Sequence, residues 1–345
     1  MNSSERGDMA LKASSALSAG GSPSTGSGRS GKIGSAETRS SQAGAAEPAS
    51  PGRRRSAPSG LEPAAPNLLA QVWTGDRGEA SRELRPARPR EAHAVASVEA
   101  PASWPYPRWI AHRGAGKLAP ENTLAAFKLG ASHGYRMFEC DVKLSADGVP
   151  FLLHDATLAR TTNGHGVAGQ QTWQALSGLD AGSWHSAPFA GEPLPSLEAI
   201  AQYCLAHGHL LNIEIKPTPG AEAVTGTAVA NAAARLWPPT GIPPLLTSFS
   251  PEALEAAQGA QPQLPHGLLL EGLWTGWLET AVRLGCVAIV CKHTLWDGSS
   301  VLQAQSAGFR VLSYTVNDEA EARRLVDLGT DGIITDRVDH FRPDC

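Results

Sequence analysis

Short apolar segments alternate with longer amphipathic segments from residue 107 to the end of the chain. Alternation of this kind is typical of repeated strand–helix units that build a parallel sheet. A first helix is expected to begin near Glu121 and to end at Gly130 or Gly134, and later helices are clearest at 196–207, 223–236 and 318–328. The expected strands span 108–112, 138–145, 149–154, 210–216, 245–249, 267–270, 287–291, 311–315 and 332–335.

The number and order of these segments predict one closed barrel. An Ala-Asp-Gly turn at 146–148 indicates that 149–154 returns antiparallel to the preceding strand, which leaves eight parallel strands. Residues 156–195 are rich in Gly, Trp and Thr and are expected to form a small insertion after the second strand. We therefore expect a TIM (β/α)8 barrel with its active site at the carboxyl ends of the strands. A doubly wound open sheet is the alternative, disfavoured because no glycine fingerprint follows a first strand.

Residues 1–103 have a different composition from the rest of the chain. Ser, Ala, Gly, Pro and Arg dominate, and the longest apolar stretch, at 68–73, is too short to bury a core. Such a segment cannot offset the entropy lost on ordering, so it is predicted to be a disordered tail before a barrel domain at 104–345. Because the chain's methionines are Met1, Met9 and Met137, an over-extended reading frame is a second interpretation of the tail.

Charge and cysteine content exclude several classes of protein. The net charge of −4 divides into +3 over residues 1–100 and −7 over the remainder, which is poor support for nucleic-acid binding. The chain lacks both the apolar core of a signal peptide and the run of about 20 apolar residues that a transmembrane helix needs. No metal-type CxxC spacing occurs, so we expect reduced thiols in a cytoplasmic protein. The cysteines are Cys140, Cys204, Cys286, Cys291 and Cys345.

Charged side chains interrupt two of the apolar strands at alternate positions. Because strand side chains alternate between faces, Glu139 and Asp141 share one face of their strand. Asn212, Glu214 and Lys216 share a face in the same way, and the apolar residues between them suit packing against outer helices. We therefore expect the polar sets of both strands to point into the barrel.

Three of these inward carboxylates predict a cation site. Burying Glu139, Asp141 and Glu214 is costly unless a cation or another partner neutralises them. An oxygen-only set suits Mg²⁺ or Ca²⁺ rather than Zn²⁺, which favours nitrogen and sulfur. In the alternative interpretation, Glu139 and Asp141 lie exposed on an edge strand and pair with Lys143 or Arg136.

Two histidines end apolar strands at the expected catalytic mouth, namely His112 and His154. Histidine is suited to proton transfer near neutral pH, and general acid–base catalysis needs one group to take a proton and another to give one. The pattern therefore predicts a general acid/base pair. Structural roles are expected for His133, His165, His185, His207 and His266.

Short motifs throughout residues 109–339 resemble those of glycerophosphodiester phosphodiesterases of the cytoplasmic bacterial type, and they occur in the family's order. The matching segments are His112-Arg113-Gly114, Pro120-Glu121-Asn122-Thr123, Glu139-x-Asp141, His154-Asp155, Thr157-Leu158-x-Arg160-Thr161-Thr162-Asn163-Gly164, Asn212-x-Glu214-x-Lys216, Ser248-Phe249, Tyr314-Thr315-Val316-Asn317 and Asp331-Gly332-Ile333-Ile334-Thr335-Asp336.

The resemblance implies metal-dependent hydrolysis of a glycerophosphodiester to glycerol 3-phosphate and an alcohol. The implied cation is Mg²⁺ or Ca²⁺, with Mn²⁺ as a further candidate. The positions that match Arg113 and Lys216 would contact the phosphate, and Glu121 would lie near the metal or a substrate hydroxyl. The order of the two histidines, the nucleophile (water or a glycerol hydroxyl), the headgroup and the oligomeric state stay open.

Two other functions compete with this interpretation. A lysophospholipase D could use the same residues, with an apolar groove to which Trp173, Trp184 and Phe189 of the insertion would contribute. An inactive binding or scaffold barrel is the alternative from another class. It is disfavoured because an inactive member would be expected to lack at least one of the two histidines or three carboxylates, and all five are present.

Overall fold

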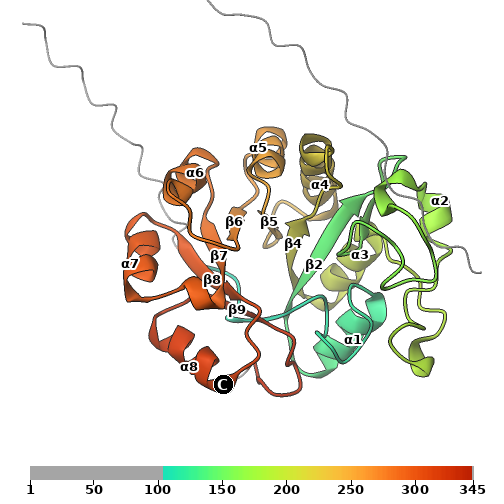
Figure 1. The fold of residues 1–345 in the computed structure, drawn as a ribbon, viewed down its shortest axis with the longest axis horizontal. Coiled ribbons are helices and arrows are strands. Elements are labelled where there is room, and N and C mark those ends of the chain that lie inside the picture. The colour runs from blue at the N-terminus through green and yellow to red at the C-terminus, as the bar shows by residue number, and fades with distance from the viewer. Residues whose placement is uncertain (1–103, 344–345) are drawn as a thin grey trace, which may run out of the picture. The chain divides into compact units, whose positions relative to one another are not determined.

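The computed structural model describes residues 104–343, in which nine strands form one sheet. Figure 1 looks along the barrel, with the strands inside a ring of helices. The strands are β1 (Trp109–Ala111), β2 (Met137–Leu144), β3 (Pro150–Leu152), β4 (Leu210–Ile215), β5 (Leu245–Ser248), β6 (His266–Leu270), β7 (Ala288–Lys292), β8 (Arg310–Tyr314) and β9 (Gly332–Thr335). The α-helices are α1 (Leu124–Ser132), α2 (Trp173–Leu176), α3 (Leu197–His207), α4 (Glu222–Leu236), α5 (Pro251–Ala260), α6 (Trp277–Arg283), α7 (Gly298–Ser306) and α8 (Glu319–Asp327).

The sheet closes on itself. All strands except β3 run parallel to their neighbours, and β1 pairs with both β9 and β2. This closure confirms the TIM (β/α)8 barrel and excludes the doubly wound open sheet. The strand β3 pairs antiparallel with β2, as the turn at 146–148 predicted.

Every strand lies within two residues of its predicted bounds, but the first helix begins later than expected. The prediction placed its start near Glu121, whereas α1 begins at Leu124. Thr123 has extended backbone geometry, and its side chain accepts a hydrogen bond from the Ala126 backbone N–H. This N-cap satisfies a free donor of the first turn and leaves Glu121 in the loop after β1.

The barrel interior is apolar near the amino ends of the strands. Strand alternation brings the inward side chains together there. The buried members of this cluster are Tyr106, Ile110, Met137, Leu245, Leu269, Ala288, Val290, Leu312 and Ile334. Two larger apolar clusters lie between the strands and the helices. Glu214 and Lys216 lie toward the other end of the barrel, where the strands finish.

The insertion between β3 and α3 has its own small apolar cluster, which includes Phe151, Leu158 and Leu176. It is joined to α1 through Glu192, whose side chain accepts a hydrogen bond from the Ala125 backbone N–H (2.9 Å). Because α1 follows the loop that carries His112, this bond links the insertion to one wall of the site.

The prediction of a disordered tail over 1–103 lies outside the described residues. Within residues 104–343, no helix is both long enough and apolar enough to cross a bilayer. Cysteines that the structure describes are buried and form no disulfide: Cys140, Cys204, Cys286 and Cys291.

Candidate active site

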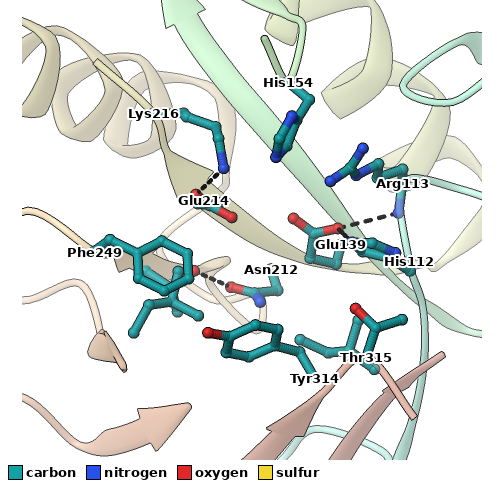
Figure 2. Close-up of a pocket in the computed structure, with 13 residues that line it drawn as sticks. His112, Arg113, Glu139, His154, Asn212, Glu214, Lys216, Phe249, Tyr314 and Thr315 are labelled. Carbon is teal, nitrogen blue, oxygen red and sulfur yellow. Dashed lines mark hydrogen bonds and ion pairs between the residues drawn. The ribbon is translucent and has the colours of Figure 1, made fainter. Parts of the chain in front are cut away.

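A pocket opens at the carboxyl ends of the barrel strands, and Figure 2 shows the side chains that line it. One part of the lining is charged, from β1, β2 and β4 and the segments that follow them. The other part is uncharged and includes aliphatic, aromatic, amide and hydroxyl side chains. The lining residues are His112, Arg113, Glu139, His154, Asn212, Glu214, Lys216, Thr247, Phe249, Leu269, Tyr314, Thr315 and Ile334.

The three carboxylates predicted from strand alternation meet in this pocket. Glu139, Asp141 and Glu214 each offer an oxygen, and these oxygens lie within 4.8 Å of one another. All three side chains are buried, and the register of β2 against β4 places Asp141 opposite Glu214. The arrangement excludes the alternative of an exposed edge strand, because β2 has β1 and β4 on either side.

The proposed partners of that alternative also lie elsewhere. Lys143 is buried and donates a hydrogen bond to the backbone oxygen of Lys216 (3.2 Å), while Arg136 is exposed. The cations nearest Asp141 are instead Arg113 Nε and Lys216 Nζ, each 3.3 Å from a carboxylate oxygen. Lys216 Nζ also donates to Glu214 at 2.6 Å.

The two positive charges, on Arg113 and Lys216, are too few to neutralise three buried carboxylates, and both lie beside Asp141. Burial and the charges of Asp141 and Glu214 raise the pKa of Glu139 well above its usual value. Burial and Asp141 likewise raise the pKa of Glu214, to about 7. Burial opposes ionisation of Asp141 too, yet Arg113 and Lys216 bring its pKa below the usual value. A hard divalent cation among three carboxylate oxygens would supply the missing charge, so the residues fit such an ion.

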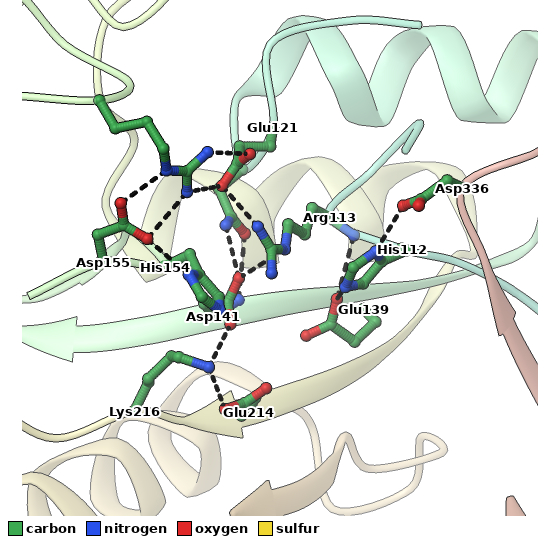
Figure 3. A network of polar contacts seen from close by, with 12 residues as sticks. His112, Arg113, Glu121, Glu139, Asp141, His154, Asp155, Glu214, Lys216 and Asp336 are labelled. Carbon is green, nitrogen blue, oxygen red and sulfur yellow. Dashed lines mark hydrogen bonds and ion pairs between the residues drawn. The ribbon is translucent and has the colours of Figure 1, made fainter. Parts of the chain in front are cut away.

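His112 follows β1 and is held by a carboxylate from the far end of the chain. Its Nδ1 lies 2.6 Å from Asp336 Oδ1. Asn317 holds that carboxylate in turn, because its Nδ2 donates to Asp336 Oδ2 and its Oδ1 accepts from the Asp336 backbone N–H, both at 2.9 Å. The other ring nitrogen, Nε2, is 3.8 Å from Glu139 Oε2 and so faces the acidic cluster (Figure 3).

His154 is held by its sequence neighbour. Its Nδ1 lies 2.7 Å from Asp155 Oδ1, and Arg160 donates to both oxygens of Asp155 at 2.6 and 3.0 Å. The remaining donors of Arg160 bind both oxygens of Glu121 at 2.8 Å. Burial, which outweighs the opposing charge of Asp141, lowers the pKa of His154. Figure 3 shows this chain of contacts next to the acidic cluster.

Arg113 is positioned by a loop with unusual backbone geometry. Arg113 and Asn122 both have positive φ, 51° and 59°, a region that non-glycine residues rarely adopt. The Asn122 backbone N–H bonds the Arg113 oxygen, and its side-chain amide both donates to Asp141 and accepts from the Asp141 backbone N–H. The loop also requires Gly116, since a Cβ there would lie 2.2 Å from the Asp336 main chain. Strain of this kind is typical of functional sites.

The structure therefore brings seven of the eight predicted residues to one pocket or its acidic cluster. The eighth, Glu121, is joined to them through Arg113 Nη1, which donates to it at 2.7 Å. Sequence reasoning assigned no role to Asp155, Arg160, Asp336 or the amide of Asn122, although each belongs to a quoted motif. The available signal for Asp155 was its position directly after a strand-end histidine.

Comparisons with known proteins identify the family of this chain. Residues 112–340 match the glycerophosphoryl diester phosphodiesterase family. A glycerophosphodiester phosphodiesterase of Caldanaerobacter subterraneus is 33% identical over 234 residues, which cover 66% of this chain and 93% of that protein. A second, from Bacillus subtilis, is 28% identical and covers 67% and 84%.

Solved structures of relatives have the same fold. A phosphodiesterase of Oleispira antarctica, in complex with the product sn-glycerol 3-phosphate, has a TM-score of 0.64 and 35% identity, covering 67% of this chain and 93% of that one. A glycerophosphodiester phosphodiesterase of Agrobacterium tumefaciens has a TM-score of 0.58 and 29% identity, covering 68% and 98%. With a family match over nearly the whole barrel and relatives aligned along most of their length, the chain belongs to the glycerophosphoryl diester phosphodiesterase family of hydrolases.

Proposed function

We propose that this protein hydrolyses small glycerophosphodiesters to glycerol 3-phosphate and an alcohol, using a divalent cation and a histidine acid/base pair. One observation carries the proposal. His112 and His154, each bound through Nδ1 to a carboxylate, stand at one pocket that also contains two cationic side chains and a buried acidic triad. The product in the Oleispira antarctica complex supports glycerol 3-phosphate as the product that keeps the phosphate.

The charged residues have different roles in binding the phosphodiester. Arg113 and Lys216 line the pocket and supply positive charge for the phosphoryl oxygens as negative charge develops in the transition state. Glu139, Asp141 and Glu214 would hold Mg²⁺ or Ca²⁺, with Mn²⁺ as a further candidate. When bound, the cation polarises a phosphoryl oxygen and lowers the pKa of a hydroxyl at the site. Glu121 orients Arg113 through the 2.7 Å bond.

The two histidines move protons. With Nδ1 directed to a carboxylate, each ring has Nε2 available to exchange a proton with substrate. One ring takes the proton of the nucleophile, which is water or the neighbouring glycerol hydroxyl, and the other protonates the departing alcohol oxygen.

The lysophospholipase D alternative receives little support from the insertion. Trp173 packs against Phe151 at 6.2 Å, and Trp184 and Phe189 both pack against the His185 ring. None of these three predicted aromatic residues lines the pocket. The inactive-barrel alternative is disfavoured because the two histidines, the two cationic side chains and the three carboxylates all lie at the same pocket or in its acidic cluster.

A substrate panel tests the proposed function. Glycerophosphocholine, glycerophosphoethanolamine, glycerophosphoglycerol and a lysophospholipid are assayed for release of glycerol 3-phosphate, or its acylated form, with and without EDTA. We expect the first three to be hydrolysed, EDTA to abolish activity, and Mg²⁺, Mn²⁺ or Ca²⁺ to restore it. Faster hydrolysis of the lysophospholipid would favour the alternative, and full activity in EDTA would contradict the role of the acidic triad.

A further inference from the structure

One side chain that lines the pocket has a buried hydrogen-bond donor with no partner among the described residues. Asn212 is 1% exposed, and its Oδ1 accepts a hydrogen bond from Thr247 Oγ1 at 2.9 Å. Its Nδ2 bonds to nothing in residues 104–343. In Figure 2 a dashed line meets the oxygen of the Asn212 amide, and the nitrogen points away from that line.

Such a donor is informative because buried polar groups in folded proteins almost always have a partner. Several other buried polar atoms of the described chain also lack one, but apart from Asn212 only Arg113 lines the pocket. Arg113 already has a proposed role at the phosphate. The carboxylates nearby favour the amide nitrogen on the pocket side, since the amide oxygen there would be repelled by them.

The depth of Asn212 indicates which part of a substrate it meets. It lies two residues before Glu214 and four before Lys216 in the same strand direction, and a strand rises about 3.3 Å per residue. The amide is therefore deeper in the barrel than the proposed phosphate contacts. A leaving alcohol of variable size needs a path to solvent, so the glycerol fragment is the part that would occupy the deep end.

The surroundings of the amide suit a hydroxyl group. A hydroxyl both accepts and donates a hydrogen bond. Asn212 supplies the donor, and Glu139, its direct neighbour across the β2–β4 register, supplies a carboxylate acceptor. Leu269 and Ile334, which also line the pocket, offer apolar contact to the carbon chain.

We infer that the Asn212 amide donates a hydrogen bond to a glycerol hydroxyl of the substrate, which makes Asn212 a specificity-determining residue for the glycerol fragment. The inference rests on the proposed function for the identity of the substrate. Thr247 acts as a positioning residue, because its hydroxyl holds the amide oxygen and so directs the nitrogen into the pocket. A ligand without that hydroxyl leaves the buried donor unmet, and sites that bind a hydroxyl discriminate strongly against such ligands.

Binding of two small phosphates to the full chain tests the inference. Calorimetry in Mg²⁺ buffer compares sn-glycerol 3-phosphate with propyl phosphate, which has the same phosphate and carbon chain but no hydroxyl. The wild type should prefer glycerol 3-phosphate. Asn212→Ala should weaken glycerol 3-phosphate binding about tenfold, or about 1.4 kcal/mol, and should leave propyl phosphate binding within about twofold.

Further variants separate binding from folding. Asn212→Ser, which keeps a small polar side chain, covers the case in which the alanine variant does not fold, and it should show the same selective loss. Thr247→Val should lose glycerol 3-phosphate affinity by a smaller factor, about threefold on the scale of a partly retained hydrogen bond. Thr225→Val is the matched control, because that buried hydroxyl in α4 also has no partner among residues 104–343 but lies outside the pocket.

Each outcome decides between a contact and a structural role. Equal losses for both ligands, or no loss for either, would overturn the role of Asn212, as would a wild type that binds the two phosphates equally. A wild type that prefers glycerol 3-phosphate but hydrolyses no glycerophosphodiester would instead reject the proposed function and leave the Asn212 contact standing.

Discussion

Two groups of residues hold the histidines of the pocket, and they differ in charge. The His112 arm consists of His112, Asp336 and Asn317, in which a neutral amide holds the carboxylate. The His154 arm consists of His154, Asp155, Arg160 and Glu121, in which a guanidinium binds both oxygens of the carboxylate. In both arms the histidine Nδ1 is bound to an aspartate, so the same kind of contact fixes the orientation of each ring.

The difference lies in what binds each carboxylate and in how exposed that carboxylate is. Asp336 is bound by the neutral amide of Asn317 rather than by an arginine. Asp155 shares its charge with Arg160, and it is also more exposed, with 27% of its side chain accessible against 13% for Asp336. Two rings with one geometry therefore lie beside carboxylates that differ in their partners and in their exposure.

Removal of either histidine side chain should have the largest effect on kcat. His112→Ala and His154→Ala are each expected to reduce kcat by about 10²- to 10⁴-fold, the usual contribution of a general acid or base. Steady-state release of glycerol 3-phosphate measures the loss. His133→Ala, an exposed histidine after α1, is the matched control and should leave kcat unchanged. If either active-site variant retained a tenth of the wild-type rate, that histidine would not be the general acid or base.

Neutralising the two aspartates compares the arms directly. Asp336→Asn and Asp155→Asn are expected to reduce kcat about 10- to 100-fold, the scale seen when partners that orient functional histidines are lost. Asp336→Asn should be the more damaging, because that carboxylate is more buried and its charge is not shared. Kinetics of the two variants under one set of conditions measure the ratio. Equal losses would mean that Arg160 does not weaken the His154 arm.

The same contrast applies to the carboxylates between the arms. Arg113 and Lys216 keep the pKa of Asp141 low, whereas burial and Asp141 raise that of Glu214 to about 7. Below pH 7 a cation must displace a proton from Glu214, so the apparent Kd should rise by up to about tenfold per pH unit as the pH falls. Above pH 7 the contribution of Glu214 to this dependence should disappear.

Calorimetry with Mn²⁺ from pH 5.5 to 8.5 measures that dependence of the apparent Kd. Glu139, whose pKa is also raised, acts in the same direction, while Asp141 adds nothing in this range. A Kd that stays constant from pH 5.5 to 7 would show that the carboxylates are ionised before the cation binds.

The smallest expected effect comes from the guanidinium of the His154 arm. Arg160→Met returns the full charge of Asp155 to His154, so the pKa of that ring should rise and the corresponding limb of the kcat/KM profile should move to higher pH. We expect a shift of less than about one unit, since Arg160 and Asp155 are partly exposed and solvent screens them. Arg323→Met, which removes an exposed ion pair with Glu319, is the control. A shift to lower pH would contradict the argument.

The fold and the acidic triad could be predicted from the sequence because they depend on local patterns. Alternation within a strand sets the direction of Glu139 and Asp141 whatever the rest of the chain does. The same rule places Glu214 and Lys216 on one face of β4. The later start of α1 was missed because the prediction followed the apolar periodicity and overlooked Thr123 as the capping residue.

The hydrogen-bond and ion-pair partners of the site residues could not be predicted from local patterns. His112 and Asp336 are 224 residues apart, and they meet because β1 pairs with β9 when the barrel closes. Arg160 and Glu121 are 39 residues apart and meet because the insertion packs beside the loop after β1. No spacing in the sequence distinguishes these contacts from many others.

The sequence by itself determined which side chains enter the barrel, because side-chain direction in a strand follows from the period of the backbone. Only the tertiary structure decided what each of them meets there. The different partners of the two histidine-bound carboxylates arise from strand register and barrel closure, which bring distant residues into contact. Burial leaves the Asn212 amide with a donor that has no partner in the described part of the chain, because it excludes the water that would otherwise bind there.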